Sequence, residues 1–383
     1  MAQVLHLHDA PHILGGASAY LRRMATELSS QGHQNTFFSL DAPMPGWETS
    51  SEVYHYPWPG SSVTRRRDFH YSHPPLQAAL AACVRNHRPD LIHIQNWTVF
   101  RQTLFPCLGR LGIPTVMTVH DFSLLEPNPT GVPRTGITGG PRRLLDRHSM
   151  HRAAKAVFSS IDRFLCPSQA LIDQLGAPPE KTRLHRLPVE VTAKAPSAPT
   201  IDPGGPLRLF FAGSYYPSKG VDILLQALAR IEVAVELELA GGGPEENNLK
   251  ELSLELNINH KVKFLGPLVR KEMEAAYTRC QVVVLPSRVL ENSPLVLLEG
   301  GSFGRPALAS DLGGIPELVQ DPAHGWTFPS EDVDALSACL TSIAANPAEI
   351  CKRGIALRAF VAAKFRPSSH WQQLAETYDE LLK

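Results

Sequence analysis

The chain has 383 residues, of which 43% are hydrophobic and 19% are charged, and its formal net charge is zero. This composition is typical of a globular protein and excludes an intrinsically disordered chain. The balance of 37 basic and 37 acidic residues argues against a dedicated nucleic-acid binder, which normally carries a basic excess. The length is sufficient for two domains of ordinary size.

The N-terminus carries neither a basic segment nor a long apolar core, so the sequence predicts no signal peptide. No stretch approaches the ~20 apolar residues that a membrane span requires. The cysteines are dispersed and none forms a CxxC pair, which indicates reduced, mostly packed thiols rather than a disulfide framework or a zinc site. We therefore expect a cytoplasmic protein with no bound metal.

Strands and helices alternate along the first half of the chain. A strand is expected at Val4–Leu7 and a helix at Ala17–Gln31, where apolar residues recur at helical spacing. Residues 41–75 are rich in Pro, Gly and Ser and are expected to contain irregular loop. The alternation predicts right-handed βαβ units around a parallel sheet. Further strands are expected at Asn35–Ser39, Asp90–Gln95 and Thr115–His120, and helices at Leu76–Arg85 and Leu104–Leu111.

The pattern pauses at Ala195–Pro206, which has the composition of a linker, and then restarts. We expect two doubly wound α/β domains, over 1–195 and 205–366, joined by a linker at 196–204. Ligands in such sheets bind beyond the carboxyl ends of the strands. The second set of strands is expected at Leu207–Ala212, Val235–Ala240, Val262–Leu265, Val282–Pro286 and finally Ala307–Ser310, with helices at Gly220–Arg230, Leu249–Asn257, Lys271–Cys280 and Leu295–Phe303.

The sharpest functional signal follows the expected strand Val282–Pro286. Glu291 lies on the loop, and Glu299 lies about one and a half turns into the next helix. Ser293 suits the N-cap of that helix and Pro294 suits its first turn. A helix N-terminus presents free N–H groups and a positive dipole end to an anion. Carboxylates beside such a site can bind sugar hydroxyls, so the arrangement indicates a nucleotide-sugar site.

The run from Glu291-Asn-Ser-Pro-Leu-Val-Leu-Leu-Glu299 through Gly304-Arg-Pro306 to Ser310-Asp-Leu-Gly-Gly-Ile-Pro-Glu-Leu-Val319 resembles the family 4 glycosyltransferases. The resemblance extends from Gly15 to about Pro329. It implies the GT-B fold, in which two Rossmann-like domains face a central cleft. It also implies a retaining hexosyltransferase of polysaccharide biosynthesis or a related process. Such an enzyme takes a sugar from a UDP-, GDP- or ADP-sugar and passes it to a saccharide, glycolipid or small-molecule acceptor, without metal or cofactor.

The family's roles carry over where this chain matches its motifs. Glu291 would lie at the donor sugar, Glu299 would bind the ribose, and the backbone of Asn292–Leu295 would hold sugar and phosphate oxygens. Lys219 would grip the diphosphate from the loop that begins at Gly213. Ser214 stands where the family usually has an arginine, so one phosphate cation is either missing or supplied by another residue. His120 would lie beside the donor sugar.

Other loops resemble backbone contacts of the family. Gly241 matches a glycine-rich turn, and Leu265 ends the strand whose loop receives the base. Gly15 and Gly16 match a Gly-Gly loop near the diphosphate or acceptor. The tail, residues 367–383, would form a helix that returns to the first domain. A lipid-linked acceptor would bring peripheral contact with the inner face of the membrane through the first domain, with Arg65–Arg67 and Arg142–Arg143 as candidate residues.

Other interpretations were weighed against this one. A catalytically weakened nucleotide-sugar-binding scaffold subunit stays open because of Ser214. An epimerase would need acid and base carboxylates that the sequence does not place, and no GxGxxG follows the first strand as a dehydrogenase requires. Asp332-Val-Asp334 has the form of a metal-binding DxD motif but precedes an expected helix, so it is interpreted as a helix N-terminus. His93 is expected to pack or hydrogen-bond locally.

Overall fold

The computed structural model describes residues 1–8, 16–40, 52–56, 73–97, 101–124, 155–191, 198–201 and 204–383. By their contacts these residues form two compact units. The first unit holds the described residues up to His185 together with Trp371–Lys383, and the second holds those from Arg186 to His370. Both units are of the α/β class that the sequence predicts.

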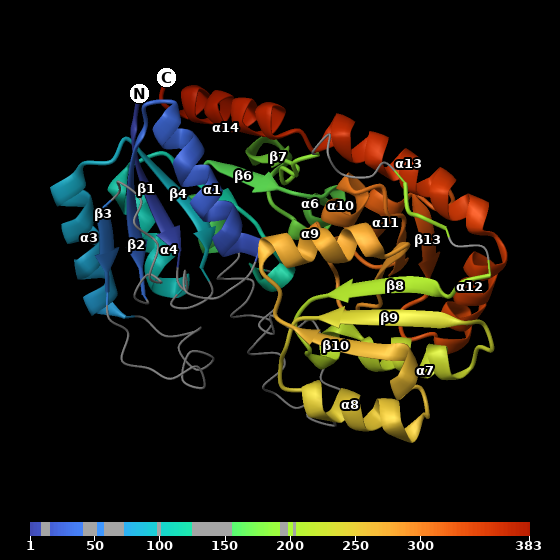
Figure 1. Ribbon diagram of the computed structural model, residues 1–383. Helices are drawn as coiled ribbons and strands as arrows, with labels where there is room; N and C mark the ends of the chain where they lie inside the picture. The colour runs from blue at the N-terminus through green and yellow to red at the C-terminus, as the bar shows by residue number, and fades with distance from the viewer. Residues whose placement is uncertain are drawn as a thin grey trace. The chain divides into compact units, whose positions relative to one another are not determined.

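The first unit contains a parallel sheet with the strand order β3-β2-β1-β4-β5-β6-β7 (Figure 1). All of its strand pairs are parallel. The strands are β1 (Gln3–His8), β2 (Gln34–Ser39), β3 (Glu52–His55), β4 (Leu91–Asn96), β5 (Thr115–Thr118), β6 (Arg163–Cys166) and β7 (Thr182–Leu184). Its helices include α1 (Gly16–Ser30), α3 (Pro74–His87), α4 (Arg101–Leu111) and α6 (Gln169–Leu175).

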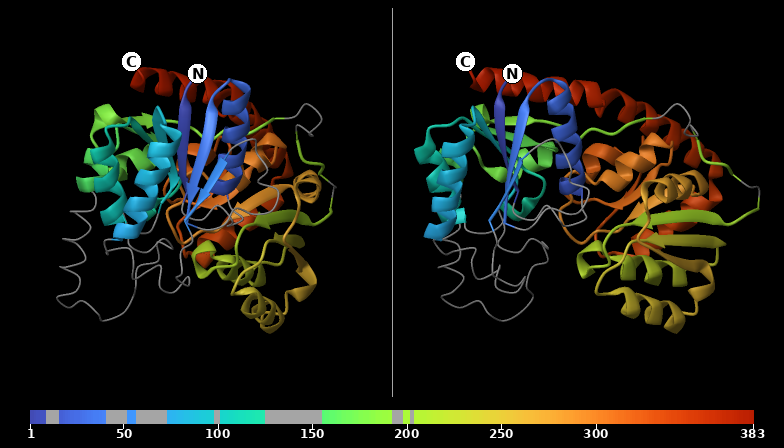
Figure 2. Two further views of the ribbon diagram at one scale, coloured as in Figure 1. Left: turned by 90° about the vertical axis from the view of Figure 1, so that its left-hand side faces the viewer. Right: turned by 60° about the vertical axis from the view of Figure 1, so that its left-hand side comes forward.

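The second unit repeats this plan with the strand order β10-β9-β8-β11-β12-β13, again all parallel. The helices α8 and α9 cover opposite faces of its sheet (Figures 1 and 2). The strands are β8 (Leu207–Ala212), β9 (Val235–Ala240), β10 (Val262–Gly266), β11 (Val282–Leu285), β12 (Ala307–Ser310) and β13 (Gly325–Phe328). The helices are α7 (Val221–Ala229), α8 (Glu246–Glu255), α9 (Arg270–Arg279), α10 (Leu295–Ser302), α11 (Ile315–Val319), α12 (Val333–Ala345) and α13 (Pro347–Lys364).

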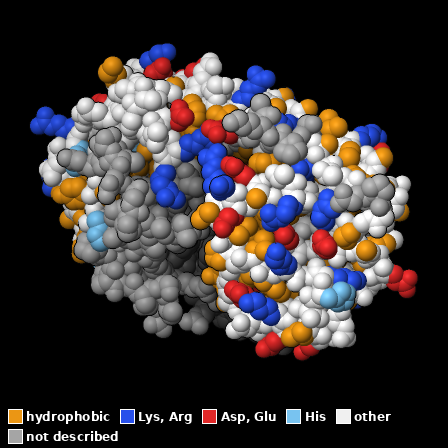
Figure 3. Space-filling model, viewed as in Figure 1, with side chains coloured by type: hydrophobic (Ala, Val, Ile, Leu, Met, Phe, Trp, Pro, Cys, Tyr) orange, Lys and Arg blue, Asp and Glu red, His pale blue; other side chains and the backbone are white. Residues whose placement is uncertain are grey.

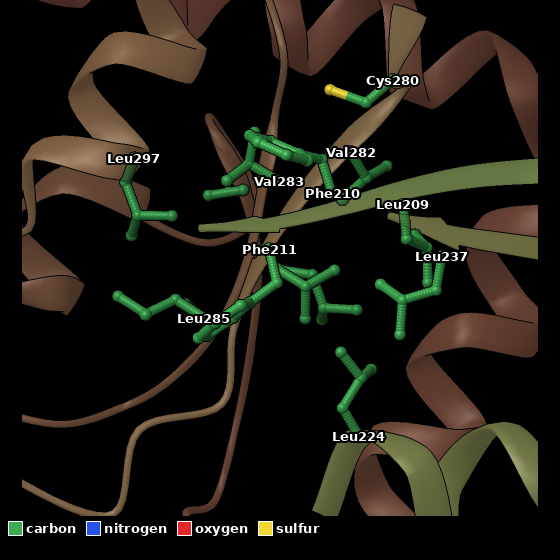
Figure 4. Close-up of a cluster of buried hydrophobic side chains, with 14 of the residues drawn as sticks. Leu209, Phe210, Phe211, Leu224, Leu237, Cys280, Val282, Val283, Leu285 and Leu297 are labelled. Carbon is green, nitrogen blue, oxygen red and sulfur yellow. The ribbon is translucent and has the colours of Figure 1, made fainter. Parts of the chain in front are cut away.

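The core of the second unit explains why its central strands are nearly uninterrupted apolar runs. Every residue of β11 is buried, as expected for a parallel strand covered on both faces. Figure 4 shows Phe210 on one side of β8, with Leu297 of α10, and Phe211 on the other side, with Leu224 of α7. The alternation of side chains along β8 therefore packs helices against both faces of the sheet.

One expectation about the second unit needs correction. Ala307–Ser310 is not the last strand, because β13 pairs with it and extends the sheet. The long helix α13 also follows, outside the predicted set. The strand β13 has only the residues Gly-Trp-Thr-Phe, and a run this short shows no clear periodicity. In the first unit, the short strand β3 lies within the segment 41–75, for which the sequence predicts no particular strand.

The last helix, α14 (Pro367–Leu381), packs within the first unit over its C-terminal part. Its Trp371, Leu374 and Tyr378 are buried. The Tyr378 hydroxyl lies 2.6 Å from Nδ1 of His93, and the hydroxyl of Thr118 lies 2.8 Å from the other ring nitrogen of His93. His93 thus packs and hydrogen-bonds inside the fold, as the sequence predicts.

Composition-level expectations also have counterparts in the structure. All six cysteines are free, and four of them are buried, which confirms packed thiols. On the face of the second unit seen in Figure 3, acidic and basic side chains are interspersed rather than gathered by sign. Among the described residues, no helix is long and apolar enough to cross a bilayer.

Candidate functional site

The second unit places two loops side by side at the carboxyl edge of its sheet. The strand order reverses between the neighbours β8 and β11, and a ligand of an open α/β sheet binds at such a switch point. The loop after β8 carries Lys219, and the loop after β11 carries Glu291. A backbone hydrogen bond of 2.8 Å from Arg288 N–H to the Ser218 carbonyl joins the loops. The topology therefore brings together two residues that the sequence singles out separately.

Lys219 and Glu291 form an ion pair. The distance from Lys219 Nζ to Glu291 Oε1 is 2.6 Å, and the side chains are only 26% and 13% exposed. The hydroxyl of Ser287, which is fully buried, donates to the same carboxylate oxygen at 2.5 Å. Oε1 of Glu291 therefore accepts two charge-assisted hydrogen bonds, one from Lys219 and one from Ser287. An anion arriving at this edge would meet a lysine already held in place.

An arginine that the sequence analysis missed ties the two loops together. Arg288 donates through Nη1 and Nη2 to the two carboxylate oxygens of Asp222, both at 2.7 Å, and through Nη1 to the Pro217 carbonyl at 2.8 Å. A bidentate pair of this kind between a guanidinium and a carboxylate fixes the relative orientation of the two side chains as well as neutralising their charges. Asp222 and Arg288 are separated by 66 residues, so no local pattern distinguishes them from solvated surface charges.

The backbone of Glu291 is held by the Gly313–Gly314 turn. Gly314 N–H donates to the Glu291 carbonyl at 2.6 Å. Gly313 has a φ of +61°, and a Cβ built there would lie 2.3 Å from that carbonyl oxygen. Only glycine fits both the left-handed conformation and the space. This gives a structural reason for the glycines in the motif that extends to Val319.

Glu299 lies in α10, where its carboxylate meets a tyrosine from a neighbouring helix. Tyr277 of α9 is 2% exposed, and its hydroxyl donates to Glu299 Oε2 at 2.8 Å. Burial raises the pKa of Glu299, while the Tyr277 hydrogen bond and the charge of Arg270 oppose that rise. Tyr277 was not identified from the sequence, since at helical spacing it is indistinguishable from an ordinary core tyrosine.

The predicted N-cap of α10 is wrong by one residue. Pro294 is the N-cap, because its carbonyl accepts from Leu297 N–H at 3.1 Å and its ψ of 108° is still extended. The hydroxyl of Ser293 is buried and has no hydrogen-bond partner among the described residues. Asn292 and Pro294 are buried, whereas Leu295 is half-buried. The segment Asn292–Leu295 thus leads from Glu291 into the first turn of α10.

Glycines at the ends of β8, β9 and β10 meet at the same edge. Gly213 N–H donates to the Ala240 carbonyl at 3.0 Å, and Gly241 N–H donates to the Gly266 carbonyl at 2.9 Å. A Cβ at Gly241 would lie 1.9 Å from the Gly213 carbonyl oxygen, so the two loops touch through their backbones. Ser214 is exposed next to this contact, and Leu265 is half-buried in β10.

Of the site residues predicted in the first unit, the structure describes Gly16 and His120. Gly16 begins α1, whereas Gly15, Arg65–Arg67 and Arg142–Arg143 lie outside the described residues. His120 is half-buried just beyond β5, with Nε2 at 3.2 Å from Gln95 Oε1 and its ring centroid 5.3 Å from that of Tyr20. Burial, and to a smaller extent the nearby His8, lower the pKa of His120 to about 3. The imidazole is therefore neutral near pH 7, and it can exchange hydrogen bonds without adding charge.

The Asp332-Val-Asp334 segment is a helix N-terminus, as predicted. Asp332 is the N-cap of α12, where its carboxylate accepts from Ala335 N–H at 2.8 Å. Asp334 forms an ion pair with Arg230. Within the part of the chain that the structure describes, no group of three or more His, Cys, Asp and Glu side chains is arranged to hold a metal ion.

Comparison with known proteins places this geometry in a family. Residues 14–191 match the model described as "Glycosyltransferase Family 4", and residues 197–356 match "Glycosyl transferases group 1". The D-inositol 3-phosphate glycosyltransferase of Saccharomonospora viridis is 27% identical over 90% of this chain and 86% of its own length. A glycogen synthase of Mycobacterium tuberculosis is 24% identical over 95% and 90%.

Solved structures show the same fold. The sucrose-phosphate synthase of Thermosynechococcus elongatus has a TM-score of 0.81 at 20% identity, covering 100% of this chain and 99% of its own. HepE of Anabaena, solved with UDP-glucose, has a TM-score of 0.75 at 18% identity, covering 99% and 100%. With its two parallel-sheet domains of the GT-B fold, the chain belongs to the family 4, or group 1, glycosyltransferases.

Proposed function

We propose that the chain is a metal-independent, retaining hexosyltransferase that uses a nucleotide-diphosphate sugar as donor. The acceptor is a saccharide, a glycolipid or a small molecule. The observation that carries the proposal is the Lys219–Glu291 ion pair at the switch point of the second unit, where Lys219 Nζ lies 2.6 Å from Glu291 Oε1. Such a pair can bind two ligand groups at once, because the lysine can bind a diphosphate and the carboxylate can accept from a sugar hydroxyl.

In this proposal the bond between the sugar's anomeric carbon and the diphosphate oxygen breaks while a bond to the acceptor oxygen forms. The acceptor approaches from the face that the diphosphate leaves, so the anomeric configuration is retained. As its bond to the sugar breaks, the diphosphate oxygen gains negative charge and becomes more basic than it was in the donor. It then takes the proton of the acceptor hydroxyl. Lys219 and the N-terminal amides of α10 stabilise the charge that develops on the diphosphate, which is electrostatic catalysis.

The other residues have binding roles. Glu291 orients the donor sugar through hydrogen bonds, and Glu299 binds the ribose hydroxyls. The glycine-rich loops after β8 and β9 let backbone N–H groups approach the phosphates, as glycines commonly do. Lys219 exchanges its bond to Glu291 for one to the diphosphate when the donor enters. No residue in this scheme needs a metal, and Asp332 and Asp334 already have partners in α12 and Arg230.

The relatives support a nucleotide-sugar donor and leave its base open. HepE is described in complexes with UDP and with UDP-glucose. Two further relatives, which match less than half of this chain, are described as GDP-mannose-dependent mannosyltransferases. The acceptors named among the relatives range from inositol phosphate to glycogen and lipids. We therefore keep UDP-, GDP- and ADP-sugars as donor candidates.

Thermal unfolding with UDP, GDP, ADP and their common sugars, in EDTA, tests the proposal. We expect one nucleotide to raise the melting temperature selectively, and Lys219→Ala to remove the effect. Lys352→Ala, which changes a lysine 74% exposed on α13, is the matched control and should bind normally. Stabilisation only when a divalent cation is present would refute metal independence. Nucleotide binding without sugar transfer to any acceptor would indicate a scaffold subunit instead.

A further inference from the structure

Each carboxylate of the candidate site has one oxygen held by a buried hydroxyl. Tyr277 donates to Oε2 of Glu299 at 2.8 Å, and Ser287 donates to Oε1 of Glu291 at 2.5 Å. The other oxygens, Oε1 of Glu299 and Oε2 of Glu291, make no hydrogen bond within the described part of the chain. Both glutamates thus have the same arrangement, with one oxygen fixed by the protein and one oxygen left to accept from a ligand.

The Tyr277 hydroxyl has a fixed position. Its ring packs edge-on against Phe210 at 5.3 Å between centroids, and at 5.5 Å from Phe303. The backbone carbonyl of Tyr277 accepts from Nε of the buried Arg305 at 2.6 Å. Burial raises the pKa of Tyr277 well above its usual value, so the phenol stays protonated and keeps its donor hydrogen.

Ser287 is held in position through hydrogen bonds to its backbone. It is fully buried two residues after the end of β11, and its carbonyl accepts from the hydroxyls of Ser310 at 2.8 Å and Ser330 at 3.0 Å. The hydroxyl of Ser287 is therefore a donor on a short side chain, and the backbone that carries it is fixed by these hydrogen bonds. It stays in place when the longer side chain of Lys219 leaves Glu291 for another anion.

We propose that Tyr277 and Ser287 are positioning residues that present Glu299 and Glu291 to the donor. Tyr277 aims the open oxygen of Glu299 at the ribose diol. Ser287 keeps the Glu291 carboxylate oriented after the diphosphate has taken Lys219. This inference rests on the proposed donor site and adds two residues to it. Its physical basis is that a glutamate without such a bond loses conformational freedom on binding, which weakens binding of the ligand.

The test for Tyr277 compares a ribonucleotide with its deoxy analogue. For the nucleotide diphosphate that binds the wild-type chain, we expect Tyr277→Phe to raise the dissociation constant about tenfold. This is the effect of losing one hydrogen bond to a charged group. The 2′,3′-dideoxy form lacks the hydroxyls that Glu299 would bind, so Tyr277→Phe should change its affinity by less than about twofold. Equal losses for both ligands would show a general structural effect and overturn the role of Tyr277.

Tyr378→Phe is the matched control for Tyr277. It also removes a buried tyrosine hydroxyl, which in this case bonds His93 in the first unit. We expect it to lower thermal stability while both dissociation constants stay unchanged. If Tyr277→Phe binds both ligands as the wild type does, the positioning role of Tyr277 is likewise refuted.

The test for Ser287 separates binding from turnover. We expect Ser287→Ala to lower kcat of sugar transfer at least about tenfold while the dissociation constant of the nucleotide diphosphate stays within about twofold, because the hydroxyl acts once Lys219 has left Glu291. Ser330→Ala, which removes a hydroxyl from the Ser287 carbonyl but not the bond to Glu291, should keep kcat. Unchanged kcat in Ser287→Ala, or equal losses in the two variants, would overturn the role of Ser287. A wild-type chain that binds no nucleotide would instead overturn the proposed function, and this inference with it.

Discussion

Glu299 is a carboxylate that the fold keeps partly out of water, and this burial raises its pKa. A raised pKa in the folded state means that the native protein holds the proton more tightly than the unfolded chain does. The free energy of unfolding therefore falls as pH rises from the unfolded pKa to the folded one, and the loss persists at higher pH. A residue retained at this energetic disadvantage is a candidate for function.

Glu299→Gln should consequently make the protein more stable and a poorer binder. The amide is not charged, so the cost of ionising a buried carboxyl disappears at pH 7, and the melting temperature should rise. Affinity for a nucleotide diphosphate should fall about tenfold, because the ribose loses a charged acceptor. Calorimetry at pH 7 and nucleotide titration measure the two effects. Glu251→Gln, on the exposed face of α8, should change neither. A Glu299→Gln protein that melts below the wild type would contradict this account.

The loops at the carboxyl edge of the second unit depend on backbone contacts between elements. Gly313 combines a φ of +61° with a position where a Cβ would lie 2.3 Å from the Glu291 carbonyl oxygen. Gly176, the C-cap of α6 in the first unit, has a φ of +64° with nothing within 4 Å. The two glycines therefore have the same conformation but differ in the space around them.

Gly313→Ala and Gly176→Ala form a matched pair. Gly176→Ala should cost about 1 kcal/mol, the strain of a left-handed alanine, and should leave nucleotide binding intact. Gly313→Ala should cost more and also displace the Glu291 loop, so that sugar transfer falls at least about tenfold. Denaturant unfolding and transfer assays on both variants give the comparison. Equal behaviour would mean that the Glu291 loop tolerates the added methyl group.

The helix α14 follows the second unit in the sequence, but from Trp371 onwards its contacts lie in the first unit. Tyr378 is fully buried and bonds His93. We expect Tyr378→Ala to destabilise the first unit by about 3–5 kcal/mol, as for other large buried rings. Hydrogen exchange followed by mass spectrometry should show faster exchange in β1 and β4 but not in β9 or β12. Uniform acceleration across both units would contradict the assignment of α14 to the first unit.

Acid acts on the molecule as a whole through buried histidines that lie in the first unit. Burial lowers the pKa of His6 and of His185 to about 4, and that of His120 to about 3. Each histidine is neutral in the folded state, whereas the unfolded chain takes up protons below about pH 6.5. The free energy of unfolding therefore falls as pH drops from 6.5 towards these folded values.

We predict that the first unit loses stability before the second on mild acidification. Each of the three histidines should contribute about 1.4 kcal/mol per pH unit below 6.5, until its folded pKa is reached. Hydrogen exchange at pH 7 and pH 5 would detect the loss in β1, β5 and β7. His185→Gln should flatten the pH dependence of the first unit. Acid unfolding that begins in the second unit would contradict the prediction.

The sequence alone was enough to predict the α/β alternation and the charged residues Lys219, Glu291 and Glu299 of the candidate site. The bounds of β8 and β12 follow from apolar runs, because a parallel strand buried on both faces has a local signature. Lys219, Glu291 and Glu299 stand out because their motifs are contiguous in the chain. The N-cap at Ser293 and the end of the sheet at Ser310 were predicted wrongly, since both depend on conformation that a short segment does not encode.

Only the tertiary structure decided which side chains hold the site in place. Arg288 meets Asp222 across 66 residues, Tyr277 meets Glu299 across 22, and His93 meets Tyr378 across 285. The strand order puts the loops after β8 and β11 at one switch point, and that order is not written in the periodicity of any strand. The sequence therefore determined the elements and the chemical groups, whereas packing determined their partners, because hydrogen bonds and ion pairs act through space rather than along the chain.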